Sequence, residues 1–153
     1  MHWRHVLLMR RSMRTLDYVV RSADPVALKT KRDGPEGWTP VEILCHMRDY
    51  DEIFLLRARR ILDEDSPVFT TYNPMQMAID NQYAQQDALA VLDEMAAGRE
   101  TLTALYESLV PEQLLRTAIH PTEGVLPLYD LMMKVGHHDL DHIEQMTRVL
   151  AQE

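Results

Sequence analysis

The sequence predicts an all-α protein, a four-helix bundle with long crossover connections and a short extra helical turn. Long segments carry apolar residues three and four positions apart, which is typical of amphipathic helices. The composition agrees, because five glycines against ten methionines favour helix. No stretch of useful length alternates in the manner of a β-strand. At 153 residues the chain fits a single domain, 1–153, with a sizeable core.

The first helix is expected at about residues 3–21. Its apolar side chains recur at helical spacing, at Val6, Met9, Met13, Leu16 and Val20. Prolines and glycines interrupt the pattern in 23–38, which is therefore expected to be a long connection.

The second helix has the clearest start signal. Thr39 can cap it, Pro40 suits the first helical position, and Glu42 completes a capping box. The apolar period continues to about Leu62, which places His46 in the second turn.

The remaining elements follow with longer connections. Segment 63–74 is a second long connection, and connections of about 12 residues are uncommon in compact domains unless they serve a site. A third helix is expected over about 75–109 with a break near Gly98. Segment 110–127 is interpreted as a short helical turn and a loop, and the last helix as about 127–151.

Charge and cysteine content exclude several classes of protein. The 24 acidic and 16 basic side chains give a formal charge of −8, which repels phosphate backbones, so nucleic acid is not an expected partner. A single cysteine, Cys45, rules out an internal disulfide framework and favours a reducing cytoplasm. No signal-peptide core and no run of about 18 apolar residues is found, so a cytoplasmic protein without a membrane partner is expected.

The stretch "GHHDLDH", residues 136–142, carries three of the seven histidines. Residues four apart on a helix differ by about 40° in direction, so His138 and His142 form a pair, whereas His137 points about 100° away from His138. The pair falls on the core-facing stripe of the last helix, with Leu128, Leu131, Val135, Gln145 or Met146, and Val149. A lone histidine there would be a core residue, but burying two imidazoles without a shared purpose is costly. The pair therefore indicates a metal site as readily as a polar core.

His46 faces inward on its own helix and can supply a third nitrogen to His138 and His142. Three neutral imidazoles with an open position suit Zn²⁺ above all, and Ni²⁺ or Fe²⁺ can use the same ligands. Asp139 follows His138 as glutamate follows the first histidine of H-E-x-x-H, the zinc metalloprotease helix. That comparison fails, because aspartate is shorter and only 11 residues follow His142. Asp139 or Asp141 is instead expected to orient an imidazole through its other nitrogen; a solvated carboxylate is an equal interpretation of Asp141.

The other candidates have plainer interpretations. His2 and His5 lie near a terminus that is expected to fray, and His120 in a loop is interpreted as a polar residue on the surface without a chemical role. Cys45 is adjacent to His46, but neighbouring helix positions diverge by about 100°, so Cys45 is interpreted as a small buried residue rather than a nucleophile.

Two segments together resemble the DinB family: "GWTPVEILCHMRDYDEIFLLRARRIL" and, far downstream, "HPTEGVLPLYDLMMKVGHHDLDHIEQMTRVL". The resemblance implies a four-helix bundle with a long crossover and a divalent metal held by three histidines, which fall on His46, His138 and His142. It also implies support roles for Gln145 and Arg57, and a homodimer.

The resemblance further implies a metal-dependent enzyme with a small-molecule substrate. The first hypothesis is an S-transferase that uses a low-molecular-weight thiol, namely bacillithiol, mycothiol or glutathione; a metal-dependent hydrolase is the alternative. The general base is not assigned, with Asp139 and Asp49 as candidates. A hypothesis of another class is a non-catalytic, metal-stabilised module for stress-related binding or dimerisation. A plain bundle with core histidines would bind no metal.

Overall fold

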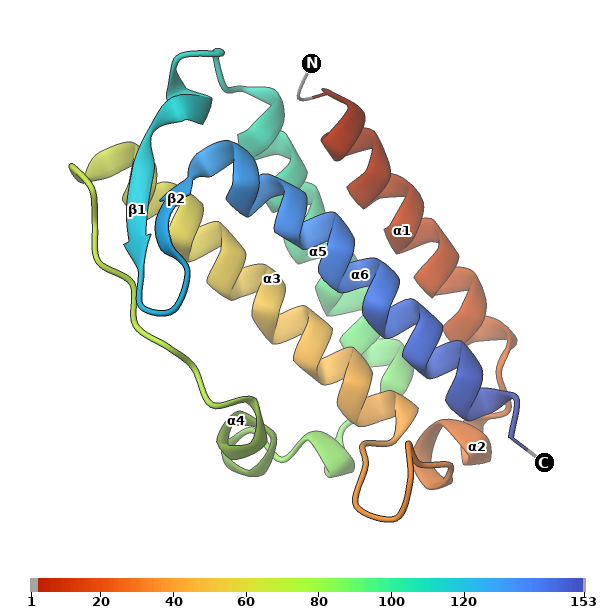
Figure 1. Ribbon diagram of the computed structural model, residues 1–153. Helices are drawn as coiled ribbons and strands as arrows, with labels where there is room; N and C mark the ends of the chain where they lie inside the picture. The colour runs from red at the N-terminus through yellow and green to blue at the C-terminus, as the bar shows by residue number, and fades with distance from the viewer. Residues whose placement is uncertain (1–2, 153) are drawn as a thin grey trace.

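The computed structural model describes residues 3–152 and confirms the four-helix bundle (Figure 1). Its long helices are α1 (Trp3–Ser22), α3 (Pro40–Asp63), α5 (Ala88–Glu107) and α6 (Leu128–Leu150). α1 packs against α5 and α6, and α3 packs against the same two helices. In Figure 1, α1 and α6 run in one direction and α3 and α5 in the other. α3 and α6 are therefore antiparallel neighbours, which brings the early histidine beside the late pair.

The bundle has an apolar core in two parts with a polar layer between them. One cluster surrounds Phe54, Ile61 and Leu131, and the other surrounds Leu16, Leu44 and Met146. Between these clusters lies a layer of four buried polar side chains, one from each long helix: Ser12, Asp51, Arg99 and Asp139. The hydrogen bonds within this layer join all four helices.

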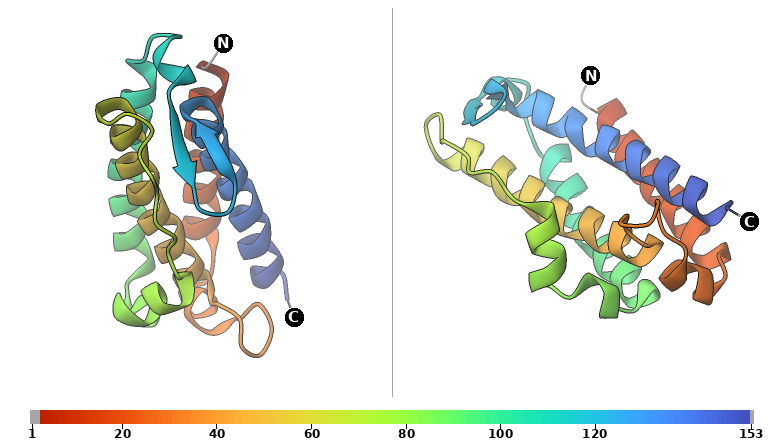
Figure 2. Two further views of the ribbon diagram at one scale, coloured as in Figure 1. Left: turned by 60° about the vertical axis from the view of Figure 1, so that its left-hand side comes forward. Right: turned by 60° about the horizontal axis from the view of Figure 1, so that its bottom comes forward.

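The connections carry more structure than the sequence indicated. The first contains the short helix α2 (Pro25–Thr30), and the second contains the isolated pairing of Val68 with Ile119 and then helix α4 (Pro74–Asp80). The chain between α3 and α5 returns along the whole bundle before α5 begins (Figures 1 and 2).

The predicted single helix over 75–109 with a break near Gly98 is wrong. The helix is interrupted at 81–87, where Gln82 has a φ of 51° and a 3₁₀ turn, η1, covers Tyr83–Gln85. Asp87 then caps α5, because its carboxylate accepts the N–H groups of Leu89 and Ala90. Gly98 lies inside α5, and a Cβ built on it would meet nothing within 4 Å.

Of the short helical turn and loop predicted after the third helix, the turn is confirmed and the loop is wrong. A 3₁₀ turn, η2 (Gln113–Leu115), precedes an antiparallel hairpin of β1 (Thr117–His120) and β2 (Gly124–Pro127). Gly124 has a φ of +76°, which favours glycine at this end of the turn. Segment 67–69 extends the pairing, since the amide of Phe69 donates to the carbonyl of Ile119 at 2.9 Å.

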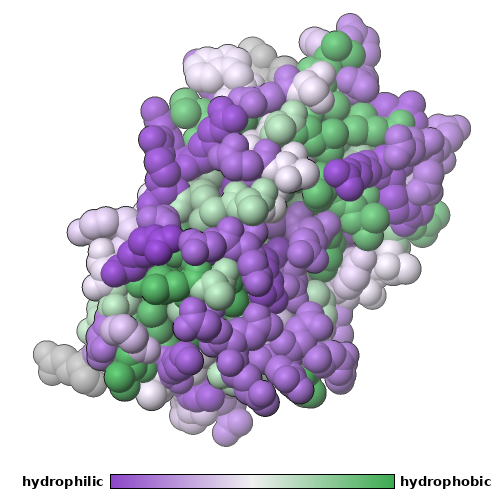
Figure 3. Space-filling model, turned by 180° about the vertical axis from the view of Figure 1, so that it is seen from behind, coloured by the Kyte–Doolittle hydropathy of each residue, from purple (hydrophilic) through white to green (hydrophobic). Residues whose placement is uncertain are grey.

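The surface seen from behind in Figure 3 is largely hydrophilic, with smaller hydrophobic patches between polar side chains. Among the described helices, length and apolarity together never reach what a membrane span requires. The expectation that His5 lies on a frayed end is wrong, because His5 Nε2 lies 2.7 Å from the hydroxyl of Tyr129. His2 lies outside the described residues.

Candidate metal centre

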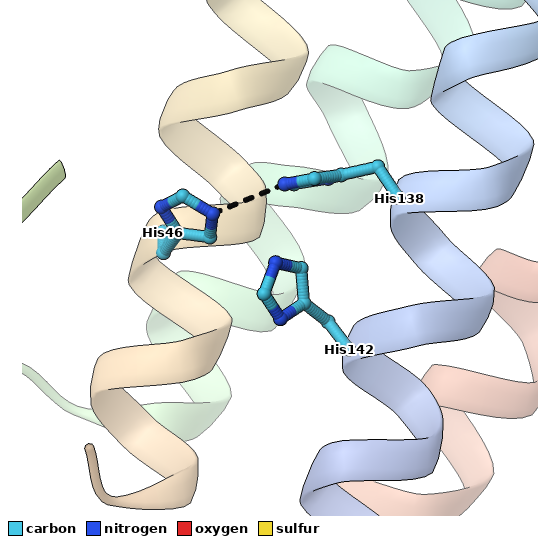
Figure 4. A group of neighbouring side chains, drawn as sticks. All are labelled: His46, His138 and His142. Atoms are coloured by element: carbon cyan, nitrogen blue, oxygen red, sulfur yellow. Dashed lines mark hydrogen bonds between the residues drawn. The ribbon is translucent and has the colours of Figure 1, made fainter. Parts of the chain in front are cut away.

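The structure brings His46, His138 and His142 together between α3 and α6 (Figure 4). One ring nitrogen of each lies within 4.8 Å of the others, and the Nε2 atoms of His46 and His138 are 3.0 Å apart. The capping box that starts α3 sets the position of His46, since Thr39 and Glu42 bond each other's backbone amides. The spacing of four residues puts the other two imidazoles one turn apart on α6.

This arrangement fits a divalent metal ion. Zinc–nitrogen bonds of 2.0–2.1 Å in tetrahedral geometry place ligand nitrogens about 3.3 Å apart, close to the separation of His46 and His138. The cluster contains only imidazole, so the donor set is three neutral nitrogens, a ligand set that suits Zn²⁺ and also Ni²⁺ or Fe²⁺. That these three residues bind a metal stays a prediction.

Burial keeps two of the imidazoles in the form that a metal requires. Desolvation is the largest cause that lowers the pKa of His46 to about 4 and that of His138 to about 2, and the neighbouring imidazole of His142 lowers both further. Asp49 acts in the opposite sense on His46 but more weakly. Both side chains are therefore neutral at physiological pH and can donate a lone pair to a cation.

The low pKa of His138 predicts acid sensitivity of the metal-free fold. The unfolded chain takes up a proton at this residue below about pH 6.5, whereas the folded chain stays neutral down to about pH 2. The contribution of His138 to stability is therefore complete above about pH 6.5 and is lost as the pH falls. Relative to the His138→Gln variant, the wild type should lose about 2–3 kcal/mol of unfolding free energy between pH 8 and about pH 4.5.

Urea unfolding in the presence of a chelator at both pH values measures this difference. His137→Gln, which changes an exposed histidine on the same helix, should lose the same amount as the wild type. Parallel pH dependence in the wild type and His138→Gln would contradict the prediction.

Ring packing orients His46. The side chain is 6% exposed, and its ring centroid lies 4.9 Å from Trp38 and 4.4 Å from Tyr50. Its Nδ1 is buried and has no hydrogen-bond partner within residues 3–152. Tyr50 also stacks on His138 with centroids 5.0 Å apart. Tyr50 thus packs on two of the three histidines, and the signal for this role in the sequence is its place one turn after His46.

A hydrogen-bonded chain orients His142. Its Nδ1 lies 2.8 Å from Oε1 of Gln145, and the amide nitrogen of Gln145 donates to Asp33 at 2.8 Å. Arg148 donates to the same carboxylate at 2.6 Å. An Nδ1–H that donates to Gln145 leaves Nε2 as the lone-pair nitrogen for a metal. This contact agrees with the support role expected of Gln145. Asp33, in the first long connection, was missed, because its distance in sequence from α6 gives no signal.

The role expected of Asp139, orienting an imidazole, is wrong. Asp139 is 1% exposed and points into the polar layer, where it accepts from Arg99 at 2.6 and 2.8 Å and from Ser12. Adjacent helix positions diverge by about 100°, so a residue next to His138 cannot face the same cluster. Asp139 is therefore also unavailable as a general base.

Asp49 is tied to other partners as well. Its carboxylate accepts from the Tyr83 hydroxyl at 2.6 Å, from Asn81 at 2.8 Å and from Arg48 at 2.9 Å. Cys45 is fully buried, and burial raises the pKa of its thiol to about 12, which fits a small core residue and not a nucleophile.

A cleft of about 390 Å³ lies beside the histidines, and His138 forms part of its wall. Its apolar side is aromatic, from Tyr50, Phe54 and Tyr72. Its polar side is lined by Arg57, Thr71, His120, Glu123, Lys134, His137 and Asp141. His120, which was expected to be a surface residue without a chemical role, and His137, which lies outside the cluster, both line this cleft. Of the three clustered histidines, His138 lines the cleft and His46 and His142 do not, so the cleft reaches the centre from the side of His138.

The chain is similar in sequence to proteins of a known family. A sequence model of the DinB superfamily matches residues 8–146. A protein of Halalkalibacterium halodurans, named as a proposed metal-dependent hydrolase, is 28% identical over 121 residues, which cover 76% of this chain and 69% of that protein.

Solved structures show the same fold. YfiT from Bacillus subtilis, described as a proposed metal-dependent hydrolase with an unusual four-helix bundle topology, has a TM-score of 0.84 at 23% identity over 99% of this chain and 89% of its own. A mycothiol-dependent maleylpyruvate isomerase has a TM-score of 0.78 at 10% identity; the match covers 95% of this chain but only 60% of the isomerase. At identities of 23% and 10%, these two matches are evidence of a shared fold.

Proposed function

The chain belongs to the DinB superfamily, and from that premise we propose that it is a metal-dependent enzyme whose three-histidine centre acts on a low-molecular-weight thiol. The observation that carries the proposal is the open geometry of the centre, in which three imidazole nitrogens lie within 4.8 Å beside a cleft. Three ligands leave a fourth position of a tetrahedral site for a small molecule, as in catalytic zinc sites. Zn²⁺ is the first expected ion, with Ni²⁺ or Fe²⁺ as alternatives.

A divalent ion in this centre would supply Lewis acidity that favours the ionised form of a thiol or of water. The chain itself holds the ligands: Gln145 fixes the ring of His142, and Tyr50 packs against His46 and His138. In S-transfer, the thiolate sulfur bonds to an electrophilic carbon, the leaving group departs with the bonding electrons, and the thiol proton passes to solvent.

A thiol substrate has support from the fold, because a similar structure is that of a mycothiol-dependent isomerase. Bacillithiol, mycothiol and glutathione are the candidate thiols. Hydrolysis is the second candidate function, since the relative from Halalkalibacterium halodurans and YfiT are both named as proposed metal-dependent hydrolases. The two functions share the metal centre and differ in whether a thiol or water attacks.

The test is turnover by zinc-loaded protein purified without an affinity tag. Each of the three thiols is combined with 1-chloro-2,4-dinitrobenzene, and formation of the thioether is followed by absorbance. We expect thioether formation with at least one of the thiols. This turnover should require the metal and should be abolished in His46→Ala. His5→Ala, which changes a histidine on α1, should keep the wild-type rate.

The other outcomes separate the alternatives. Failure of every thiol, with metal-dependent and His46-dependent hydrolysis of 4-nitrophenyl acetate, would replace the transferase by the hydrolase. A bound ion with neither activity, and with a fourth protein ligand closing its coordination, would favour the non-catalytic binding or dimerisation module.

A further inference from the structure

Arg57 lines the cleft beside the histidines, and among the described residues no acidic side chain is in direct contact with its guanidinium. The side chain is 9% exposed, and its Nη2 donates to the backbone carbonyl of Thr70 at 3.0 Å. Within residues 3–152 its guanidinium takes part in none of the ion pairs, and its Nε and Nη1 have no hydrogen-bond acceptor. Arg60, one turn further along α3, shows the contrast, because it pairs with Glu64 at 2.6 Å.

The surroundings of Arg57 favour a planar anion. Its Cζ lies 5.1 Å from the ring of Phe69 and 5.5 Å from that of Tyr72, so aromatic faces fix the plane of the guanidinium. Burial is the largest influence on the pKa of Arg57 and lowers it, and the weaker opposing influences of Tyr72, Tyr50 and Glu123 offset this only in part. Arg57 is thus a partly desolvated cation without a direct ion pair. Such a cation is costly unless an anion is supplied. Lys134 in the same cleft is already paired with Glu123 at 2.6 Å.

We propose that Arg57 is the anion-binding residue of this cleft, and that the substrate is a small organic carboxylate whose carboxylate group pairs with Arg57 while its reacting atom lies at the histidine centre. The planar fork of arginine matches a carboxylate through two parallel hydrogen bonds. Arg57 follows His46 by about three turns of α3, or about 16 Å along the helix axis, and it lines the same cleft as His138. The substrate is therefore an extended molecule whose carboxylate is several bonds away from the reacting atom, with the rings of Tyr50 and Phe54 along its length.

The part of this inference that concerns the reacting atom rests on the proposed function. Its test uses cobalt-loaded protein, in which a coordinated thiolate gives a charge-transfer absorption. The probes are 6-mercaptohexanoate and 6-mercaptohexanol, which differ only in the charged end. We expect the carboxylate probe to bind about tenfold more tightly than the alcohol, in line with a bidentate charge-assisted pair.

Variants of Arg57 decide whether this residue causes the preference. The ratio of the two dissociation constants should fall to about one in Arg57→Gln, stay above one in Arg57→Lys, and remain at the wild-type value in Arg60→Gln. Because each ratio is measured on one preparation, a loss of folded or cobalt-loaded protein cancels. A ratio near one in the wild type, or an unchanged ratio in Arg57→Gln, would overturn the inference.

A second measurement separates this inference from the proposed function. In metal-free protein, the Nε–Hε resonance of Arg57, assigned through Arg57→Lys, should shift on titration with benzoate and not with benzyl alcohol. A benzoate shift together with no thiolate absorption from cobalt-loaded protein would overturn the proposed function and support the anion site. No benzoate shift would overturn the anion site whatever the cobalt spectra show.

Discussion

Replacing Arg99 with methionine should lower the free energy of unfolding by about 3–5 kcal/mol, because it leaves two buried carboxylates without a counter-charge. Arg99 is 1% exposed and bonds Asp51 at 2.8 and 2.9 Å and Asp139 at 2.6 and 2.8 Å. It also donates to the backbone carbonyl of Met9 at 3.1 Å. Burial alone would lower the pKa of Arg99, but the two carboxylates outweigh it and the pKa is raised.

Two further variants make this prediction specific. The triple variant Asp51→Leu, Arg99→Met, Asp139→Leu removes all three charges and should recover most of the loss, since apolar residues of similar size replace buried ion pairs at little cost. Arg10→Met removes an exposed pair with Glu107 and should change stability by about 1 kcal/mol or less. Urea unfolding at pH 7 measures all of them; a loss in Arg99→Met no larger than in Arg10→Met would refute the role of the polar layer.

The second large effect is expected in metal affinity. Wild-type protein purified without an affinity tag should hold one divalent ion per chain. His142→Ala should weaken binding about a hundredfold or more, because a structural zinc site of four ligands provides about 10–16 kcal/mol in total. Gln145→Leu keeps the three ligands but removes the acceptor that orients His142, and should weaken binding about 10- to 100-fold.

A matched control for this series lies on the same helix. His137 is exposed and lies outside the cluster of three nitrogens, so His137→Ala should bind metal as the wild type does. Elemental analysis and competition with a chromogenic chelator give the stoichiometry and the affinities. Equal metal content in the wild type and His142→Ala would exclude the histidine cluster as the site.

Local signals in the sequence were sufficient for the bundle and for part of the centre. The capping box at Thr39 fixed the start of α3, and the spacing of four placed His138 and His142 on one face of α6. The pairing of His46 with them required knowing that α3 and α6 are neighbours, which spacing within one helix cannot show. The inward face of His46 made it a candidate third ligand, and the resemblance to the DinB family implied the same three residues.

The differences between the structure and the predictions from sequence also have physical causes. Asp139 was misjudged because its partner, Arg99, is a charged residue of a type that is rarely buried, and only the fold reveals that it lies in the polar layer. The hairpin was missed because each strand has four residues, too few for an alternating pattern to stand out. The break of the third helix lies before the cap residue Asp87 and not at Gly98, since a single glycine inside a helix costs only about 1 kcal/mol relative to alanine.

The topology of the bundle also determines when the metal centre can assemble. The imidazoles of His46 and His138 are 92 residues apart in the chain, so they meet only after the long segment between them has been closed into a loop. A bundle with such distant contacts folds more slowly than one with short up-and-down connections. An ion held by both helices cannot guide the early steps of folding, because its ligands are not yet together. It would act instead on unfolding, because it would slow the separation of α3 from α6 and so prolong the lifetime of the native state.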